Sequence, residues 1–140
     1  MKEEITLSWI DKMAFGTEVN GHKLIVDAKE EFGGENRGPR PKPLMLVALA
    51  GCTGMDVVSI LKKMKVKLSG FNVRIEGSLT ENHPRHYNKM HIIYTFEGKS
   101  LNPEKLQKAV ELSQQQYCGV SFSYRKAMEI STEIIVVKSD

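Results

Sequence analysis

The stretch LMLVALAGCTGMDVVSILKKM, residues 44–64, carries the strongest structural pattern in the sequence. It is apolar on every side for three helical turns before Lys62 and Lys63 appear near its end. A helix that is hydrophobic all round belongs in a buried position. In a chain of 140 residues, we expect a sheet and a second subunit to wrap this helix. Pro43 suits its first turn, where the missing N–H is not needed.

The segments before this helix predict a three-stranded antiparallel meander and then a loop. Residues 4–10 alternate in polarity, which is typical of a half-buried strand. Residues 13–19 and 23–28 flank Asn20-Gly21, the dipeptide that favours a tight hairpin turn most strongly. Residues 29–42 contain three glycines and two prolines without any period, so they predict a loop.

The segments after the helix predict a second hairpin, a second helix and a last strand. Residues 71–77 and 90–97 alternate again, and Asn102-Pro103-Glu104 supplies the cap, proline and acid that start a helix. Cys118-Gly119 ends that helix, and a short helix over 121–128 and a strand over 132–137 follow. The order βββ-α-ββ-α-β predicts one α+β domain over 1–140, an antiparallel sheet packed on the long buried helix.

Charge and segment lengths restrict the class of protein. The net charge of +3 comes from 20 basic and 17 acidic residues without a run of five like charges, so we expect no nucleic-acid partner. The N-terminal MKEEITLSW lacks the apolar core of a secretory signal, and the uncharged stretch 44–55 is too short to cross a bilayer. We therefore expect a cytoplasmic protein without a membrane partner, in which structural disulfides are rare.

Cys52 lies in the middle of the long helix between Gly51 and Gly54. Glycine inside a helix costs about 1 kcal/mol relative to alanine, so two of them indicate that a partner helix or a ligand approaches the backbone there. The alternative interpretation is a small buried hydrophobic residue without chemistry.

Cys118 follows an amphipathic helix at the junction with the next helical turn. A thiol at a helix N-terminus has a lowered pKa, because the free amides and the helix dipole favour the thiolate. The alternative is a helix-ending cysteine that packs beside Tyr117.

His83, His86 and His91 form the other cluster that could hold a metal. They fall in or after a polar turn, and no cysteine or acidic cluster completes a site. Gly33-Gly34 and Gly38 match neither a GxGxxG motif nor a P-loop. We therefore expect no bound metal and no cofactor.

The segment GPRPKPLMLVALAGCTGMDVVSILKKM, residues 38–64, resembles the hallmark of the osmotically inducible protein C (OsmC) and organic hydroperoxide resistance (Ohr) family. That family has a Gly-x-x-Pro loop that leads into a buried helix with Ala-Gly-Cys at its middle. A Cys-x-Val-Ser segment after the second helix, here Cys118-Gly119-Val120-Ser121, is the second point of similarity. Since the order of elements also agrees, the resemblance covers nearly the whole chain and indicates a divergent member.

The resemblance implies an intertwined homodimer and a peroxiredoxin-like thiol-dependent peroxidase of the oxidative-stress response. Cys52 would attack the peroxide and become a sulfenic acid, and Cys118 would condense with it to a disulfide. A dithiol reductant would restore the pair. The apolar helix around Cys52 favours an organic hydroperoxide over hydrogen peroxide as the substrate.

The sequence departs from the peroxidase pattern at the start of the long helix. Peroxidase members carry a glutamate in the first turn, where this chain has Pro43. Their activating arginine is expected in the upstream glycine-containing region, where Arg37 is the candidate and Arg40 lies nearby. An arginine close to Cys52 would favour its thiolate, whereas Asp56 would disfavour it if close.

The alternative function is a non-catalytic dimeric domain that binds an apolar small molecule or serves a structural role. The missing glutamate favours it. In that case, both thiols would titrate near the free value of about 8.5 and resist peroxide.

Overall fold

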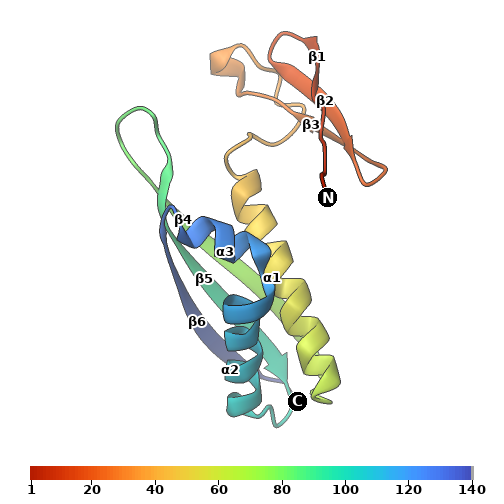
Figure 1. Cartoon of the computed structure of the whole chain (residues 1–140), viewed down its shortest axis with the longest axis vertical. Coiled ribbons are helices and arrows are strands. Elements are labelled where there is room, and N and C mark those ends of the chain that lie inside the picture. The colour runs from red at the N-terminus through yellow and green to blue at the C-terminus, as the bar shows by residue number, and fades with distance from the viewer. Residues whose placement is uncertain (140) are drawn as a thin grey trace. The chain divides into compact units, whose positions relative to one another are not determined.

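The structure of the protein is a computed structural model that describes residues 1–139. The chain forms two compact units, Met1–Met45 and the part that begins at Leu46. The first holds a small sheet and a loop, and the second holds a larger sheet with its helices (Figure 1).

The N-terminal unit contains the predicted meander. Its strands β1 (Ser8–Asp11), β2 (Ala14–Val19) and β3 (His22–Val26) pair antiparallel in the order β1-β2-β3. The turn between β2 and β3 places Asn20 at φ 50° and Gly21 at φ 82°, the conformation that this dipeptide tolerates. The first strand begins only at Ser8, later than its alternation predicted.

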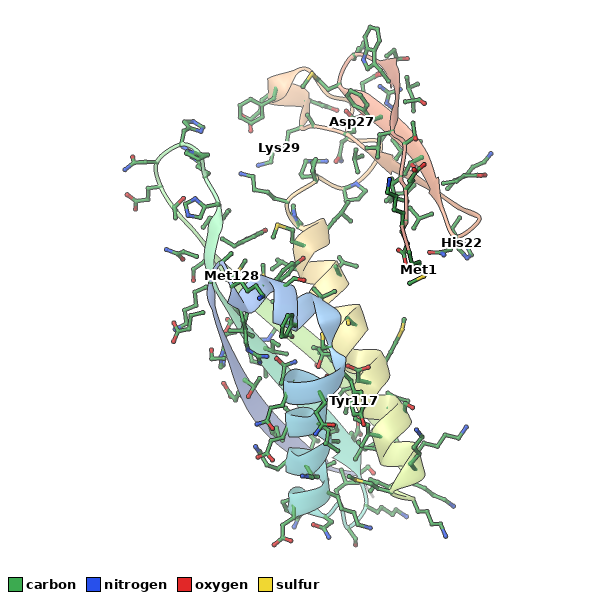
Figure 2. All side chains as sticks on the ribbon, viewed as in Figure 1. Met1, His22, Asp27, Lys29, Tyr117 and Met128 are labelled. Carbon is green, nitrogen blue, oxygen red and sulfur yellow. The ribbon has the colours of Figure 1, made fainter. Side chains whose placement is uncertain are left out.

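Asp27 organises the loop that follows β3, which includes the short 3₁₀ helix η1 (Glu30–Phe32) (Figure 2). Its carboxylate accepts backbone N–H bonds from Ala28 at 2.7 Å, Glu35 at 3.2 Å and Arg37 at 3.1 Å. Burial alone would raise the pKa of Asp27, but these amides and the guanidinium of Arg37 outweigh it and lower the pKa to about 2. The loop is therefore fixed by one buried carboxylate.

The second unit is built on the sheet β4-β5-β6, with β4 (Gly70–Leu79), β5 (Tyr87–Gly98) and β6 (Glu129–Lys138). β4 and β5 form the expected antiparallel hairpin. β6 pairs parallel with β5, so the prediction of a purely antiparallel sheet was wrong in this detail. The helical segment between β5 and β6 carries the chain back across the sheet, which is the connection that parallel neighbours need.

Three helices lie on the same side of this sheet (Figure 1): α1 (Leu44–Lys63), α2 (Pro103–Leu112) and α3 (Gly119–Arg125). The cap of α2 is the predicted one, because Asn102 Oδ1 accepts the amide of Glu104 at 2.9 Å. A π-helix, η2 (Ser113–Tyr117), continues α2. The short helix predicted at 121–128 is shorter and begins earlier, directly after Cys118.

The core of the second unit lies between the sheet and the helices. The fully buried side chains of β5 alternate along the strand, and α2 adds three apolar residues. These core residues are Met90, Ile92, Tyr94, Phe96, Leu106, Ala109 and Val110.

Helix α1 is buried along one side only. Its buried residues Leu49, Thr53, Val57 and Leu61 recur every four positions, whereas Met55 on the other side is 76% exposed. The predicted burial on all sides is therefore not achieved within one chain. By length and composition alone α1 could also span a membrane, a test that core helices pass as well.

We expect the N-terminal unit to lose stability in acid through Asp27. Because folding lowers its pKa from 3.8 to about 2, its stabilising effect is complete above about pH 4 and disappears as the pH falls through about 2. An NMR titration of the Asp27 carboxyl carbon measures this pKa, and Asp27→Asn should remove the acid-dependent step in stability. A carboxyl that titrates near its ordinary value would contradict this prediction.

Candidate functional site

The two cysteines, 66 positions apart in the sequence, meet in the second unit. The sulfur atoms of Cys52 and Cys118 and one carboxylate oxygen of Asp56 all lie within 4.8 Å of one another. Cys118 is 3% exposed and Cys52 is partly buried, and both are free thiols. The site is thus a pair of thiols beside an acid, in which Cys118 is buried and Cys52 and Asp56 are partly exposed.

The π-helix sets the position of Cys118. Its closing bond runs from the amide of Cys118 to the carbonyl of Ser113 at 2.7 Å, five residues back. Cys118 then adopts an extended conformation (φ −79°, ψ 99°) and caps α3, and its sulfur accepts the amide of Ser121 at 3.4 Å. Such π segments are rare and concentrate at functional sites.

Asp56 reaches the thiols because it lies one turn along α1 from Cys52, on the same helix face. The hydroxyl of Ser113 donates to its Oδ2 atom at 2.9 Å. No ion pair involves Asp56 within residues 1–139. Its carboxylate is therefore oriented by a neutral donor and left without a charged partner.

A buried hydrogen-bond network holds the hydroxyl of Ser113 in place. Thr53 Oγ1 lies 2.6 Å from the Tyr94 hydroxyl and 2.8 Å from Ser113 Oγ, and it accepts from Gln114 Nε2 at 3.1 Å. Since Ser113 gives its proton to Asp56, it must accept from Thr53, and Thr53 must then accept from Tyr94. All three hydroxyl protons consequently point along one path toward the carboxylate.

Gln114 joins this network to α3. Its Oε1 atom accepts from Ser121 Oγ at 3.0 Å and from the guanidinium of Arg125 at 2.6 Å. The same guanidinium also donates to the backbone carbonyl of Gln114 at 2.6 Å. Desolvation raises the pKa of Tyr94 to about 12, so its hydroxyl stays protonated at neutral pH. The network is therefore neutral apart from the guanidinium of Arg125, which contacts it through Gln114.

Electrostatics at the site oppose ionisation of Cys52. Burial raises the pKa of its thiol, and the neighbouring Cys118 and Asp56 raise it further. The backbone amide of Val120 donates to the Cys52 sulfur and lowers this pKa, but the other effects outweigh it. The expectation that Asp56 disfavours the Cys52 thiolate when close is confirmed.

Arg37, the predicted activating residue, lies in the N-terminal unit. Its guanidinium bonds to the carboxylates of Asp11 and Asp27 and lies 3.4 Å from Glu35. These acidic neighbours raise the pKa of Arg37, so it stays charged. Arg40 donates to the Gly38 carbonyl at 2.8 Å. Both arginines thus have identified roles in holding the loop.

An apolar groove of about 820 Å³ runs along the other side of α1, next to β4. Gly51 and Gly54 line it together with Val47, Met55 and Val58. A side chain at Gly51 would meet nothing within 4 Å, and at Gly54 only Val73. The close approach that these glycines predicted is therefore not made by the described part of this chain.

The sequence identified both thiols and Asp56 but missed the network behind them. Thr53, Tyr94, Ser113 and Gln114 carry no motif, and a polar residue in an apolar helix was the one available indication for Thr53. Their proximity depends on how β5 and the π-helix pack against α1.

Comparison with known proteins matches most of the chain to one family model. The family model described as OsmC-like protein matches residues 33–133. Protein YhfA of Escherichia coli strain K12 is 28% identical over 132 residues, which cover 94% of this chain and 96% of YhfA.

Solved structures share the fold. A hypothetical protein from Aquifex aeolicus matches with a TM-score of 0.87 and 25% identity, over 100% of this chain and 99% of that one. The organic hydroperoxide resistance protein OhrB of Bacillus subtilis matches with a TM-score of 0.67 and 15% identity, over 96% of this chain and 98% of OhrB.

We expect Asp56→Asn to lower the pKa of Cys52, because it removes a nearby negative charge. Alkylation of Cys52 with iodoacetamide, followed by peptide mass spectrometry across a pH series, should then reach half its maximal rate at a lower pH than in the wild type. Glu133→Gln on β6 removes a carboxylate from a different hydrogen bond, to His91, and serves as the matched control. Equal profiles for Asp56→Asn and wild type would contradict the electrostatic role of Asp56.

We also expect Thr53→Val to destabilise the protein by about 1–3 kcal/mol, because it removes a partner from three buried polar groups at nearly constant volume. Urea unfolding at neutral pH measures the change. Thr132→Val, at an exposed position on β6, should have little effect. A loss as small as that of the control would mean that the network contributes little.

Proposed function

Because the chain belongs to the OsmC-like protein family, we propose that it is a thiol-dependent peroxidase that reduces organic hydroperoxides through Cys52 and Cys118. The observation that carries this proposal is the separation of the two sulfurs, which lie within 4.8 Å although they come from distant segments. Both cysteines are free thiols in the structure, as the proposed reaction with a peroxide requires.

The proposed reaction uses the two thiols in turn. The Cys52 thiolate attacks the distal oxygen of the hydroperoxide, the O–O bond breaks, and the alkoxide leaves and takes up a proton as an alcohol. The Cys118 sulfur then attacks the resulting sulfenic acid, so that a disulfide forms and water leaves. An external dithiol restores both thiols by exchange and is itself oxidised to a disulfide.

The backbone amides at the start of α3 support this chemistry. Val120 donates to the Cys52 sulfur and Ser121 to that of Cys118, so each sulfur has an amide that stabilises negative charge. The raised pKa of Cys52 limits the thiolate fraction, and the rate of reaction should therefore increase as the pH rises through that pKa.

We assign Arg37 a smaller role in the proposed reaction than the two cysteines have. Its charge is already offset by Asp11 and Asp27, so we expect Arg37→Gln to weaken the N-terminal unit more than it slows thiol oxidation.

The apolar character of α1 supports both a homodimer and an apolar substrate. Val47 and Met55 are 64% and 76% exposed in one chain, and a second copy would bury them. The helix α1 that carries Cys52 is largely apolar, which suits an organic hydroperoxide better than hydrogen peroxide. We propose the cytoplasm as its location, where dithiol reductants keep thiols reduced.

A second candidate is a non-catalytic dimeric domain that binds an apolar small molecule or has a structural role. The raised pKa of Cys52 favours it, because a protonated thiol reacts poorly with peroxide. It requires that both thiols resist oxidation by organic peroxide at neutral pH.

Intact-mass measurement tests the proposal. One equivalent of cumene hydroperoxide should lower the mass of each chain by about two units through disulfide formation, and a dithiol should reverse this. Cys118→Ser should instead gain about 16 units as the sulfenic acid of Cys52. Cys52→Ser should show neither change nor peroxide consumption.

The outcomes separate the candidates. Full peroxide consumption by Cys52→Ser would end the assignment of Cys52. Unchanged wild-type mass after the peroxide pulse would favour the non-catalytic domain.

A further inference from the structure

Asp56 lies beside the two thiols and has no role in the proposed peroxide chemistry. Asp56 places a carboxylate oxygen within 4.8 Å of both sulfurs, and within residues 1–139 this is the one group of three such ligand atoms gathered so closely. His83, His86 and His91, the residues that the sequence offered for a metal, do not form such a group. His91 is bonded to Ser131 and Glu133 instead.

An acid beside two thiols is a poor arrangement for a thiolate nucleophile alone, because like charges repel. It is a good arrangement for a cation. Two thiolates and a carboxylate form a set of three anionic ligands, and none of the ion pairs within the described residues involves them.

The spacing suits a tetrahedral ion. With Zn–S bonds of about 2.3 Å and Zn–O bonds of about 2.0–2.2 Å, ligand atoms of one tetrahedron lie roughly 3.5–3.8 Å apart. The three atoms here already lie within 4.8 Å, so small side-chain rotations bring them to that spacing.

The surroundings resemble the outer shell of a metal site. Ser113 donates to one carboxylate oxygen of Asp56 and leaves the other free, and Thr53 and Tyr94 hold Ser113 in place. Hydrogen bonds from amides to sulfur, as Cys118 receives from Ser121, are also typical of metal-bound thiolates.

We propose that Cys52, Cys118 and Asp56 bind a Zn²⁺ ion in the reduced protein, with the fourth coordination position open to water. Sulfur ligands select a soft cation such as zinc over Mg²⁺ or Ca²⁺. Binding converts two thiols into zinc-bound thiolates and releases two protons to solvent. Because a disulfide offers no thiolate, the metal-bound form and the disulfide form exclude each other.

Cobalt and zinc titrations of the reduced, metal-free full-length protein test this site. One Co²⁺ per chain should give a sulfur-to-cobalt charge-transfer band and the visible bands of tetrahedral cobalt, and one equivalent of Zn²⁺ should abolish both. Absence of the charge-transfer band would overturn the proposal.

Variants assign the ligands. Asp56→Asn should weaken zinc binding at least about tenfold, since even outer-shell partners of a ligand contribute that much. Cys52→Ser and Cys118→Ser should each weaken it further and reduce the charge-transfer intensity. His91→Ala, the matched control, should bind as the wild type does.

Two further results would contradict the site. Unchanged zinc binding by Asp56→Asn would show that Asp56 is not a ligand. Zinc binding that is lost only in His91→Ala would show that the ion binds at a different site. The peroxide test is independent, because Asp56→Asn keeps both thiols and a failure of peroxide oxidation leaves the metal titration unaffected.

Discussion

The hydroxyl of Thr53 holds the second unit in the arrangement on which the site depends. It joins α1 to β5 through Tyr94 and to the π-helix through Ser113 and Gln114, all within the dry core. In low dielectric an unpaired hydroxyl is costly, so these partners must lie together or the core loses stability. This requirement fixes the start of the π-helix at Ser113, whose carbonyl accepts the amide of Cys118, and so helps to place the Cys118 sulfur beside Cys52.

The same network determines the charge balance of the site. It supplies a neutral donor to Asp56 and keeps the one cation, Arg125, at its far end beside Gln114. The thiols consequently share their space with an acid. Asp56 hinders thiol oxidation, because it raises the pKa of Cys52. The same carboxylate favours metal binding, because it adds a ligand for a cation. The two proposals describe two states of one cluster.

Most elements of the fold could be predicted from local sequence. Asn20-Gly21 encodes its hairpin and Asn102 its helix start through the backbone conformations and bonds that these residues favour. The parallel pairing of β6 could not be predicted, because strand direction depends on how α2 and α3 return the chain across the sheet. The full burial of α1 stays a prediction: the described chain buries one side, and an apolar pattern does not specify whether the chain itself or a second molecule covers the other.

For the site, the sequence by itself determined the reactive groups: two cysteines, and an acid that helical geometry places one turn from Cys52. It also determined the resemblance that singled these residues out. Only the tertiary structure decided that the two sulfurs meet, that Ser113 orients the acid, and that Arg37 bonds to the carboxylates of its own unit. The physical reason is distance along the chain: a helix fixes neighbours three and four residues away, whereas contacts across 66 residues arise from packing of the whole core.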